Sequence, residues 1–533
     1  MTLEQASRDP RIPPLDRCIP GRILDRHARE RPEKVFVEFQ DGTRWTYGEF
    51  HKRVRATAAG LQRLGVGQGG HVVVWLPNGP SALTVWFAIN YIGAVYVPFN
   101  IAWRGRVLEH ALQIADAALV VAHQGLVERF DGLEWRLPAA RVIVGGAGRE
   151  GWIGEAALFE APGEPAPPSR DIMPWDLHSI LYTSGTTGLS KGVLQPYLQQ
   201  YAIATGGSFL SEDDRYLMTL PLYHQGGVTG VYRMFFRGGT VIMVDAFDTS
   251  SFWSTVRATS ATSATLLGAM AKFLAKQAPS DQDRAHTLRS VIMSPLEDHH
   301  QFARRFGVDV YSVYNMTELG APLETLANPV ETGTCGRARP GFELRLVDQN
   351  DCEVPVGQAG ELVVRTDMPW ALSTGYAKDP AATANAWRNG WFHTGDLFTR
   401  DAAGNYYFCD RLKDAIRRRG ENVSAFEVES EILAHPCVQE AAVVAVPSDH
   451  SEDEILAVLA PVPGREIDPR DVLEFLRPRL AHFMIPRYIR ILPSLPKTES
   501  QKVQKQVLRD QGLVPGTWDR EAAGIRIRRE RLV

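Results

Sequence analysis

One ten-residue loop, Thr183-Ser-Gly-Thr-Thr-Gly-Leu-Ser-Lys-Gly192, has the composition of a phosphate-binding site. It holds five hydroxyl residues, three glycines and one lysine. Glycine lets the backbone bring its N–H groups close to an anion, while hydroxyl groups and a lysine add donors and positive charge. The residues that we expect to surround a phosphate are Thr183, Ser184, Gly185, Thr186, Thr187, Gly188 and Lys191.

The spacing within this loop differs from that of the common nucleotide P-loop, G-x-x-x-x-G-K-[ST]. Ser190 precedes Lys191 where the P-loop has glycine, and Gly192 follows it where the P-loop has Ser or Thr. The alternative interpretation is an ordinary surface loop rich in Gly, Ser and Thr. The density of donors directly after the apolar run 179–182, which indicates the end of a buried strand, favours the phosphate site.

The loop resembles the phosphate loop of the adenylate-forming superfamily, which includes acyl-CoA synthetases, luciferases and the adenylation domains of peptide synthetases. Other segments resemble this superfamily in the same order along residues 20–510. They are 221–227, 314–318, 333–341, 360–364, 375–376, 390–396, 410–414 and 495–503. The resemblance is closest to the carnitine/crotonobetaine–CoA ligase branch, because residues 288–296 also lack the glycines of other branches.

The resemblance implies roles for residues of two central segments. Tyr314 would lie against the adenine, beside Asn315, which replaces the usual glycine, and Thr317 would place its hydroxyl on the phosphates. Glu318 would bind Mg²⁺, a hard ion that prefers oxygen ligands. Asp396 would accept hydrogen bonds from both ribose hydroxyls. The plainer alternatives are a Thr/Glu helix start for the first segment and a turn-stabilising aspartate for the second.

Near the C-terminal end, the resemblance implies two further cationic groups and a hinge. Arg411 would reach the ribose or phosphate, Lys413 would be the hinge, and Lys502 would steady the carboxylate and the α-phosphate during adenylation. Lysines near a chain end are otherwise solubilising residues, but the Pro-Lys-Thr spacing of 496–498 favours the functional role. The arginine run 417–419 is either a solvated face or a contact for the phosphates of coenzyme A.

The acid-binding pocket is the least legible part of the sequence. Residues 221–227 match the family segment at the acyl pocket, although a lone histidine such as His224 is often a structural residue. We expect Tyr223, His224, Met293 and Ser294 to line the pocket, and Lys502, Thr317, Glu318 and His224 to form the catalytic set. The identity of the acid is not indicated.

A layered α/β fold must position these residues. Strand patterns at 35–39, 71–75 and 95–98 alternate with helical patterns at 46–64 and 80–93, which indicates parallel sheets covered by helices on both faces. Thr46 and Glu49 form a capping box that starts the first of these helices. Strand patterns at 442–446 and 455–460, with a helix opening at Asp468, indicate a compact α+β domain.

We therefore expect a large N-terminal domain of doubly wound mixed sheets, residues 1–410, and a small mobile α+β cap, residues 411–510. Another strand is expected at 310–314, directly before the segment that holds Thr317 and Glu318. The remaining tail, 511–533, carries several arginines and resembles no family segment that we can interpret. Disorder is the expectation for this tail.

Bulk composition excludes several classes of function. The chain has 533 residues, 44% hydrophobic and 23% charged, which is ordinary for a globular protein of more than one domain. A net charge of −4 without a long basic run argues against nucleic acid as the main partner. We find no stretch of about 20 apolar residues that could span a membrane. Five scattered cysteines without CxxC spacing indicate reduced thiols, a cytoplasmic location and no metal site.

Together these features predict an ATP-dependent carboxylate–CoA ligase. Its substrates would be a small carboxylic acid, ATP and coenzyme A, with Mg²⁺ as the metal ion, and it would be a monomer or a homodimer. Two alternatives stay open at this point. One is an adenylating enzyme that passes the acyl group to a carrier protein or another acceptor, and the other is a non-catalytic nucleotide-binding homologue.

Overall fold

The structure is a computed structural model. It describes residues 9–135, 137–146, 148–183, 190–294, 299–411, 415–418, 421–448, 452–496, 503 and 505–527. All statements on the structure below concern these ranges. Within them, only the backbone is described for residues 268–269, 409–411, 415, 417, 422, 424, 426 and 506.

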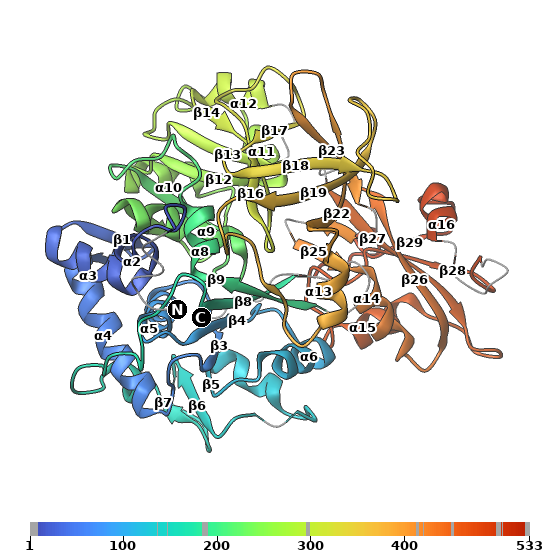
Figure 1. The fold of residues 1–533 in the computed structure, drawn as a ribbon. Coiled ribbons are helices and arrows are strands. Elements are labelled where there is room, and N and C mark those ends of the chain that lie inside the picture. Colours follow the sequence, from blue (N-terminus) through green and yellow to red (C-terminus); the bar gives the residue numbers. More distant parts are fainter. Residues whose placement is uncertain are drawn as a thin grey trace.

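Two large sheets form the centre of the N-terminal domain (Figure 1). The first has the order β14-β13-β12-β10-β11-β1-β2 and is parallel except for the pair β1 and β2. Its strands are β1 (Val35–Phe39), β2 (Arg44–Thr46), β10 (Arg215–Met218), β11 (Thr240–Met243), β12 (Ser263–Leu267), β13 (Ser290–Ser294) and β14 (Asp309–Tyr311).

The second sheet has the order β20-β9-β8-β4-β3-β5-β6-β7. Strands β8, β9 and β20 pair antiparallel, and the others are parallel. Its strands are β3 (His71–Trp75), β4 (Val95–Pro98), β5 (Leu119–His123), β6 (Ala140–Val144), β7 (Ile153–Gly154), β8 (Leu177–Thr183), β9 (Lys191–Pro196) and β20 (Gly375–Tyr376).

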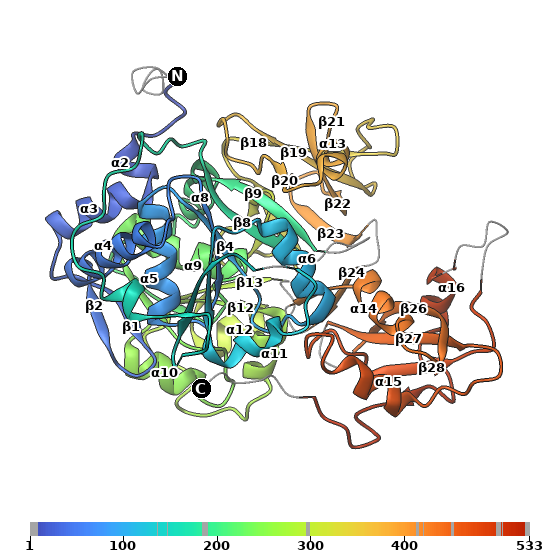
Figure 2. The same cartoon turned by 90° about the horizontal axis from the view of Figure 1, so that it is seen from below.

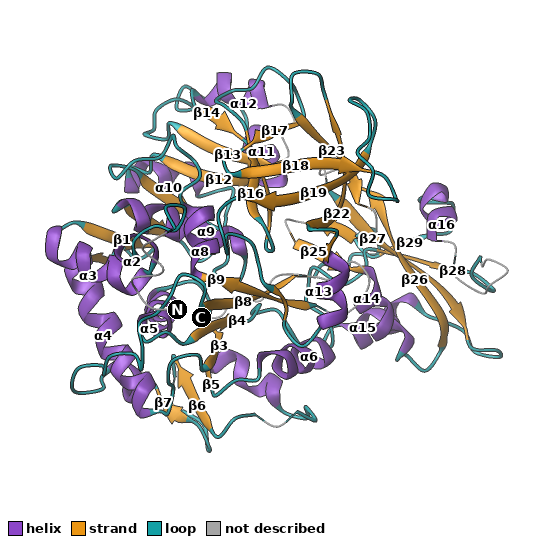
Figure 3. Ribbon diagram, viewed as in Figure 1, coloured by secondary structure: helices purple, strands orange, loops and turns teal. Residues whose placement is uncertain are grey.

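Helices between and around these sheets create the largest core (Figure 3). Strands of both sheets, together with helices α4, α5 and α9, contribute to one apolar cluster. The helices of this domain are α2 (Leu15–Cys18), α3 (Pro20–Glu30), α4 (Tyr47–Arg63), α5 (Pro80–Tyr91), α6 (Gly105–Ala115), α7 (Ala156–Phe159), α8 (Tyr197–Ala204), α9 (Gln225–Arg237), α10 (Phe252–Thr259), α11 (Gly268–Ala275), α12 (His299–Phe306) and α13 (Pro380–Ala386), with one 3₁₀ helix at Gln124–Phe130.

A third, antiparallel sheet completes the N-terminal domain. It has the order β15-β16-β17-β23-β22-β19-β18, with β21 paired to β22. Its strands are β15 (Val313–Met316), β16 (Gly320–Glu324), β17 (Thr334–Ala338), β18 (Phe342–Val347), β19 (Gly360–Thr366), β21 (Trp387–Arg388), β22 (Trp391–Arg400) and β23 (Tyr406–Arg411).

The C-terminal part of the chain forms a separate, smaller body beside the sheets (Figure 2). It contains a hairpin, β24 (Ala415–Arg418) and β25 (Glu421–Ser424), and a sheet of β26 (Val438–Pro447), β27 (Asp453–Pro461), β28 (Tyr488–Ile491) and β29 (Trp518–Asp519). Its helices are α14 (Ala425–Leu433), α15 (Pro469–Leu476) and α16 (Lys505–Gln511). The fold class is the expected one, a large α/β domain with a small α+β domain.

Most local expectations are confirmed. Thr46 caps α4. The Thr46 hydroxyl accepts from the backbone N–H of Glu49, and the Glu49 carboxylate accepts from the backbone N–H of Thr46. Such a cap stabilises a helix by about 1 kcal/mol. Strand β3 is buried and parallel to both neighbours. The Asp468 side chain accepts from Arg470 N at the start of α15.

The single strand expected over 310–314 is wrong. The chain leaves the first sheet after Tyr311 and enters the third sheet at Val313, so two strands in two sheets occupy this segment. The buried residue between them, Ser312, donates its N–H to the hydroxyl of Thr325 at 2.8 Å. A tertiary hydrogen bond therefore replaces the ladder at this point, which local sequence cannot reveal.

The disorder expected for the tail is wrong for residues 511–527. Trp518 and Asp519 pair antiparallel with β28, and Trp518, Ile525 and Ile527 pack against the core of the C-terminal domain. Asp519 also forms an ion pair with Arg487 at 3.2 Å. Apolar side chains that alternate with the arginines provide the buried contacts.

Arg418 in the arginine run is a structural residue. Its side chain is 1% exposed, forms an ion pair with Glu454 at 2.7 Å, and donates to the carbonyl oxygens of Phe483 and Ile485 at 2.9 Å. It therefore fixes the hairpin β24–β25 to the C-terminal domain. Neither a solvated face nor a phosphate contact describes this arginine.

In the described residues, we find no helix with the length and apolar character needed to cross a membrane.

Candidate active site

The ends of the predicted phosphate loop are held by an antiparallel pair of strands. Thr183 ends β8, Lys191 starts β9, and the two residues are directly opposite each other in the ladder. Residues 184–189 between them, which include the predicted Ser184, Gly185, Thr186, Thr187 and Gly188, lie outside the described residues. The strand pair thus brings Thr183 and Lys191, the two ends of the predicted loop, side by side.

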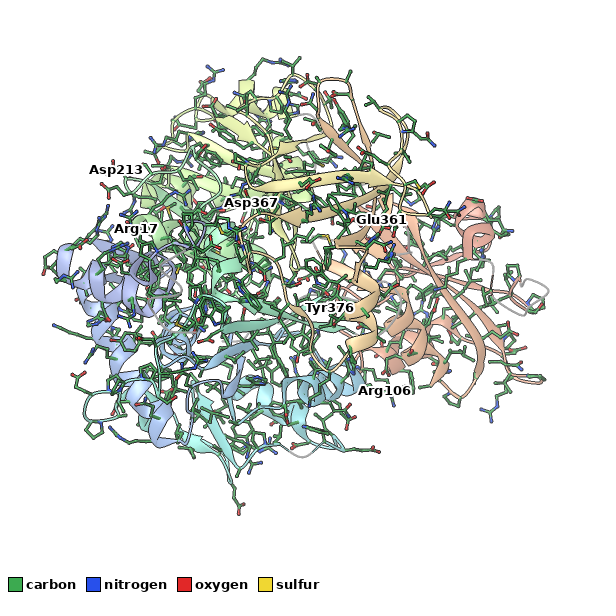
Figure 4. The ribbon with its side chains drawn as sticks, viewed as in Figure 1. Arg17, Arg106, Asp213, Glu361, Asp367 and Tyr376 are labelled. Atoms are coloured by element: carbon green, nitrogen blue, oxygen red, sulfur yellow. The ribbon has the colours of Figure 1, made fainter. Side chains whose placement is uncertain are left out.

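Tyr376 lies on the neighbouring strand β20 (Figure 4). It contacts both Lys191 and Glu318. The Lys191 ammonium lies 4.7 Å from the centre of the Tyr376 ring, and the Tyr376 hydroxyl donates to Glu318 Oε1 at 2.9 Å. Burial, and then the charge of Glu318, raise the pKa of Tyr376 well above its ordinary value. Tyr376 therefore stays a neutral donor that orients a largely buried carboxylate.

Tyr314 and Asp396 form a second pair of predicted residues. The Tyr314 hydroxyl donates to Asp396 Oδ2 at 2.7 Å, and both side chains are buried. Asp396 lies within the long strand β22 rather than in a tight turn, although Gly395 before it has a φ of 72°. Arg411 is opposite Asp396 in β23, and its backbone alone is described.

A buried glutamine network lies beneath Thr317 and Glu318. Gln195 and Gln199 both donate to the Thr317 carbonyl, at 2.7 and 2.9 Å, and Gln199 also donates to the Glu318 carbonyl at 3.0 Å. Gln195 further donates to Gln225 at 2.6 Å. These amides fix the backbone that carries the predicted phosphate and magnesium residues, while the Asn315 side chain is exposed.

His224 connects the N-terminal domain to the hairpin β24–β25. It precedes α9, and its Nε2 lies 2.6 Å from Glu421 Oε2 at the start of β25. The ring of Tyr223 lies 4.8 Å from the ring of His224. The predicted site histidine therefore makes a contact between the domains.

A second contact between the domains reaches the phosphate loop itself. Ser190 Oγ donates to Glu427 Oε1 on α14 at 2.8 Å, and both residues are buried. Burial raises the pKa of Glu427 to about 7, although the hydrogen bonds from Ser190 partly offset this effect. A carboxyl group of the small domain is therefore held against the base of the loop.

Met293 and Ser294 end β13, and they differ in burial. Met293 is 2% exposed and packs in the apolar cluster of the first sheet, while Ser294 is half-buried. Lys413 and Lys502 lie outside the described residues. Sequence reasoning missed the site positions of Glu421 and Glu427, since both are placed by the docking of a distant domain.

The described residues contain no cluster of three or more His, Cys, Asp or Glu side chains that could enclose a metal ion. A site with one carboxylate still suits Mg²⁺, because this ion keeps several waters and takes its other ligands from phosphates. Glu318, 6% exposed and oriented by Tyr376, fits that requirement.

An α/β protein of two domains, with a predicted phosphate loop and a buried carboxylate near its ends, has the features of a nucleotide-dependent enzyme. Comparison with known families makes this specific. Residues 24–377 match the family described as AMP-binding enzyme, and residues 427–502 match the AMP-binding enzyme C-terminal domain. The chain belongs to the AMP-binding enzyme family, the adenylate-forming group that its sequence resembles.

Individual relatives cover nearly the whole chain. The chain is 29% identical to a crotonobetaine/carnitine–CoA ligase of Salmonella arizonae, over 87% of this chain and 93% of the relative. It is 30% identical to an indoleacetate–CoA ligase of Aromatoleum aromaticum, over 91% and 96%. The fold is similar to that of o-succinylbenzoate CoA synthetase from Bacillus subtilis, with a TM-score of 0.80, 22% identity, and coverage of 91% and 98%.

Proposed function

We propose that this protein is an ATP-dependent carboxylate–CoA ligase. In the first step, a carboxylate oxygen attacks the α-phosphorus of ATP, which forms an acyl-adenylate and breaks the bond to pyrophosphate. In the second step, the sulfur of coenzyme A attacks the acyl carbon, and AMP leaves with the electron pair of the broken bond. The relatives named as CoA ligases support this acceptor.

One observation carries the proposal: Lys191 and Glu318 converge on Tyr376 beside the ends of the phosphate loop. A cation and an oriented carboxylate at one loop are what a magnesium–triphosphate complex requires. The enzyme has little covalent chemistry of its own to perform in such a reaction. It accelerates the reaction by positioning groups and by stabilising charge on the phosphates.

The nucleotide is held by several parts of the large domain. We assign the triphosphate to the loop 183–188 with Lys191 and Thr317, and the adenine to Tyr314 and Asn315. Asp396 is assigned to the ribose hydroxyls, with Arg411 at the ribose or phosphate. The Tyr314–Asp396 hydrogen bond supports this assignment, since it holds the carboxylate beside the ring that would face the adenine.

Mg²⁺ would be bound by Glu318 and would neutralise charge on the phosphate oxygens. The chain's own contribution is the orientation of this carboxylate. Tyr376 donates to one of its oxygens, and Gln199 holds its backbone carbonyl. A neutral donor leaves the charge of the carboxylate in place for a cation.

The small domain completes the two steps in turn. Residues 411–510 form a mobile cap in this proposal, Lys413 is the hinge, and Lys502 steadies the carboxylate and the α-phosphate in the first step. The arrangement with Glu421 on His224 and Glu427 on Ser190 corresponds to the second step, because β24–β25 then lies against the acid site. Tyr223, His224 and Ser294 are assigned to the acid pocket.

The cellular location and the oligomeric state are also part of this proposal. We assign the protein to the cytoplasm, where ATP and coenzyme A are available, and to a monomer or homodimer. No nucleic acid takes part in the reaction.

The acceptor is tested with purified full-length protein, Mg·ATP and a panel of carboxylic acids. We expect pyrophosphate release with a suitable acid, and equimolar consumption of free coenzyme A with formation of AMP. Release of pyrophosphate without consumption of free coenzyme A would contradict the thioester step. A carrier protein or another acceptor would then take the acyl group.

A further inference from the structure

We propose that the acid activated by this enzyme carries a second anionic group, a carboxylate, and that Arg233 and Arg339 bind it at the far end of the acid pocket. This inference rests on the proposed function. It concerns a group of charged side chains beneath the glycine pair Gly206–Gly207, which we call the arginine cluster: Arg233, Arg237, Arg339 and Glu324.

Arg233 forms no ion pair with any described residue. Its side chain lies on α9 and is 4% exposed, yet no described residue forms a hydrogen bond or an ion pair with its guanidinium, and Nε is fully enclosed. A buried cation without a partner is costly, because it loses its hydration and gains nothing in return. An arginine in this position is explained when an anion from outside the chain completes the site.

The two neighbouring arginines, unlike Arg233, have hydrogen-bond partners within the chain. Arg237 donates to a set of backbone carbonyls, those of Ala204, Thr205, Gly206, Gly207, Leu210 and Arg233. Arg339 donates to the carbonyls of Ala321 and Ala202 at 2.9 and 3.2 Å, and its Nε lies 3.6 Å from Glu324. Arg233 is the exception among the three.

The charge of the cluster is unbalanced. It holds three guanidinium groups and one carboxylate, and the Glu324 carboxylate pairs with Arg339. Burial, and then the like charge of Arg233, lower the pKa of Arg237 to about 10. Burial lowers the pKa of Arg339, Glu324 opposes this shift, and the like charge of Arg233 adds to it. An additional negative charge would relieve repulsion that the protein alone leaves in place.

Two elements lead from the predicted active site to this cluster. Helix α9 begins after His224 and reaches Arg233 after roughly 13 Å, and a helical side chain leans back toward the helix start. Strand β16 begins at Gly320, two residues after Glu318, and the carbonyl of its Ala321 accepts from Arg339 at 2.9 Å. Both elements therefore connect the cluster with segments of the predicted active site.

Two glycines let the backbone approach the cluster closely. A Cβ atom at position 206 would lie 2.7 Å from Cζ of Arg339, and one at position 207 would lie 3.8 Å from Nε of Arg233. Gly207 also has a φ of 74°, which other residues rarely adopt. The backbone at Gly206 and Gly207 therefore lies close to both guanidinium groups, with the ring of Phe209 beside Gly207.

The guanidinium groups of Arg233 and Arg339 would favour some carboxylic acids over others. A carboxylate accepts two hydrogen bonds from a guanidinium in a fixed geometry, so a dicarboxylic acid fits. An acid with an uncharged end leaves Arg233 unpaired. An acid with a quaternary ammonium group would bring a like charge against the cluster and is disfavoured further.

The test measures pyrophosphate release by the full-length protein with Mg·ATP and matched acids. The probes are the straight-chain dicarboxylic acids from malonate to adipate, their monomethyl esters, and monocarboxylic acids of equal length. We expect kcat/KM for the best diacid to exceed that for its own monomethyl ester by at least about 30-fold, the cost of leaving a buried charge unpaired. Equal rates for diacid and ester would overturn this inference and leave the proposed function standing. No pyrophosphate release with any acid would overturn both.

Arg233→Met, which keeps the length of the side chain and removes the charge, tests the residue. We expect it to abolish the preference for the diacid over the ester, mainly through KM, and to raise the thermal unfolding temperature of the ligand-free protein. The exposed Arg29→Met is the matched control and should change neither. An unchanged preference, or a lower unfolding temperature as for a structural arginine, would overturn the assignment. The comparison of diacid and ester in the unmodified protein remains decisive if the variant does not fold.

Discussion

Ser190 and Glu427 are joined by a 2.8 Å hydrogen bond, although they are 237 positions apart in the chain. Ser190 closes the predicted phosphate loop in the large domain, and Glu427 lies in the first turn of α14 in the small domain. Their contact shows that the small domain packs directly on the end of the predicted phosphate loop. A change in the protonation of Glu427 therefore acts directly on the contact between the two domains.

Glu427 predicts a pH dependence of stability. Burial raises its pKa from 4.5 to about 7 in the folded protein. Between these values, the folded protein binds a proton that the unfolded chain has lost, so stability falls as the pH rises from about 4.5 to about 7. The shift corresponds to about 3 kcal/mol. Glu427→Gln, which keeps an acceptor for Ser190, should remove this part of the dependence and stabilise the protein at pH 8.

Thermal unfolding of the variant and the unmodified protein, measured from pH 5 to pH 8, checks this prediction. Glu474→Gln, at an exposed glutamate of the same domain, is the control. Two curves that stay parallel over the whole range would show that Glu427 is not the titrating group.

The His224–Glu421 contact predicts a selective effect on the second step. Glu421→Ala removes the partner of His224 at 2.6 Å and should slow thioester formation by roughly 10-fold to 100-fold. Pyrophosphate release in the absence of coenzyme A should be unchanged, because the contact belongs to the arrangement assigned to the second step. Rapid-quench assays of the two half-reactions measure both rates. Glu466→Ala, at an exposed position of the same domain, serves as the comparison. Equal slowing of both steps would refute this reading.

Asp396 should determine nucleotide affinity. Asp396→Ala is expected to raise KM for ATP by roughly 10-fold to 100-fold, because the ribose hydroxyls would lose a charged acceptor. Tyr314→Phe removes only the hydroxyl that orients this carboxylate, so its effect should have the same direction and be smaller. Initial rates over a range of ATP concentrations give KM for each variant. A purely structural aspartate would instead lower stability and leave KM for ATP unaffected.

Lys502 should act in the first step alone. Lys502→Ala is expected to slow adenylation by about 100-fold or more, since one preorganised donor near the α-phosphate is lost. Thioester formation from supplied acyl-adenylate should be spared. The nearby Lys505→Ala is the matched control, because Lys505 is ion-paired with Glu429 at 2.6 Å. Full adenylation activity of the Lys502 variant would remove the lysine from the mechanism.

The sequence predicted features whose causes are local. The capping box of Thr46 and Glu49 and the uniformly apolar strand β3 follow from neighbouring residues, and both are confirmed. The break at Ser312 was missed because Thr325, its hydrogen-bond partner, is reached only when β16 folds back. The tail was misjudged because the apolar residues that pack it are few, and they are outnumbered by charged ones.

The residues of the candidate site also fall into those that the sequence could predict and those that it could not. Lys191, Glu318 and Asp396 could be identified because each lies in a short segment that resembles a family motif. Glu427 and Arg233 could not be identified from the sequence, because residues of distant segments bury their charged groups. A carboxyl group and a guanidinium are unremarkable in a sequence until the fold places them away from water.

The account depends most on the formation of an acyl-adenylate, and an isotope measurement tests this step directly. The protein is incubated with Mg·ATP, coenzyme A and a carboxylic acid labelled with ¹⁸O in its carboxylate, and the products are analysed by mass spectrometry. We predict AMP that carries one ¹⁸O atom from the acid, together with unlabelled pyrophosphate. Unlabelled AMP, or ADP as the nucleotide product, would contradict the account.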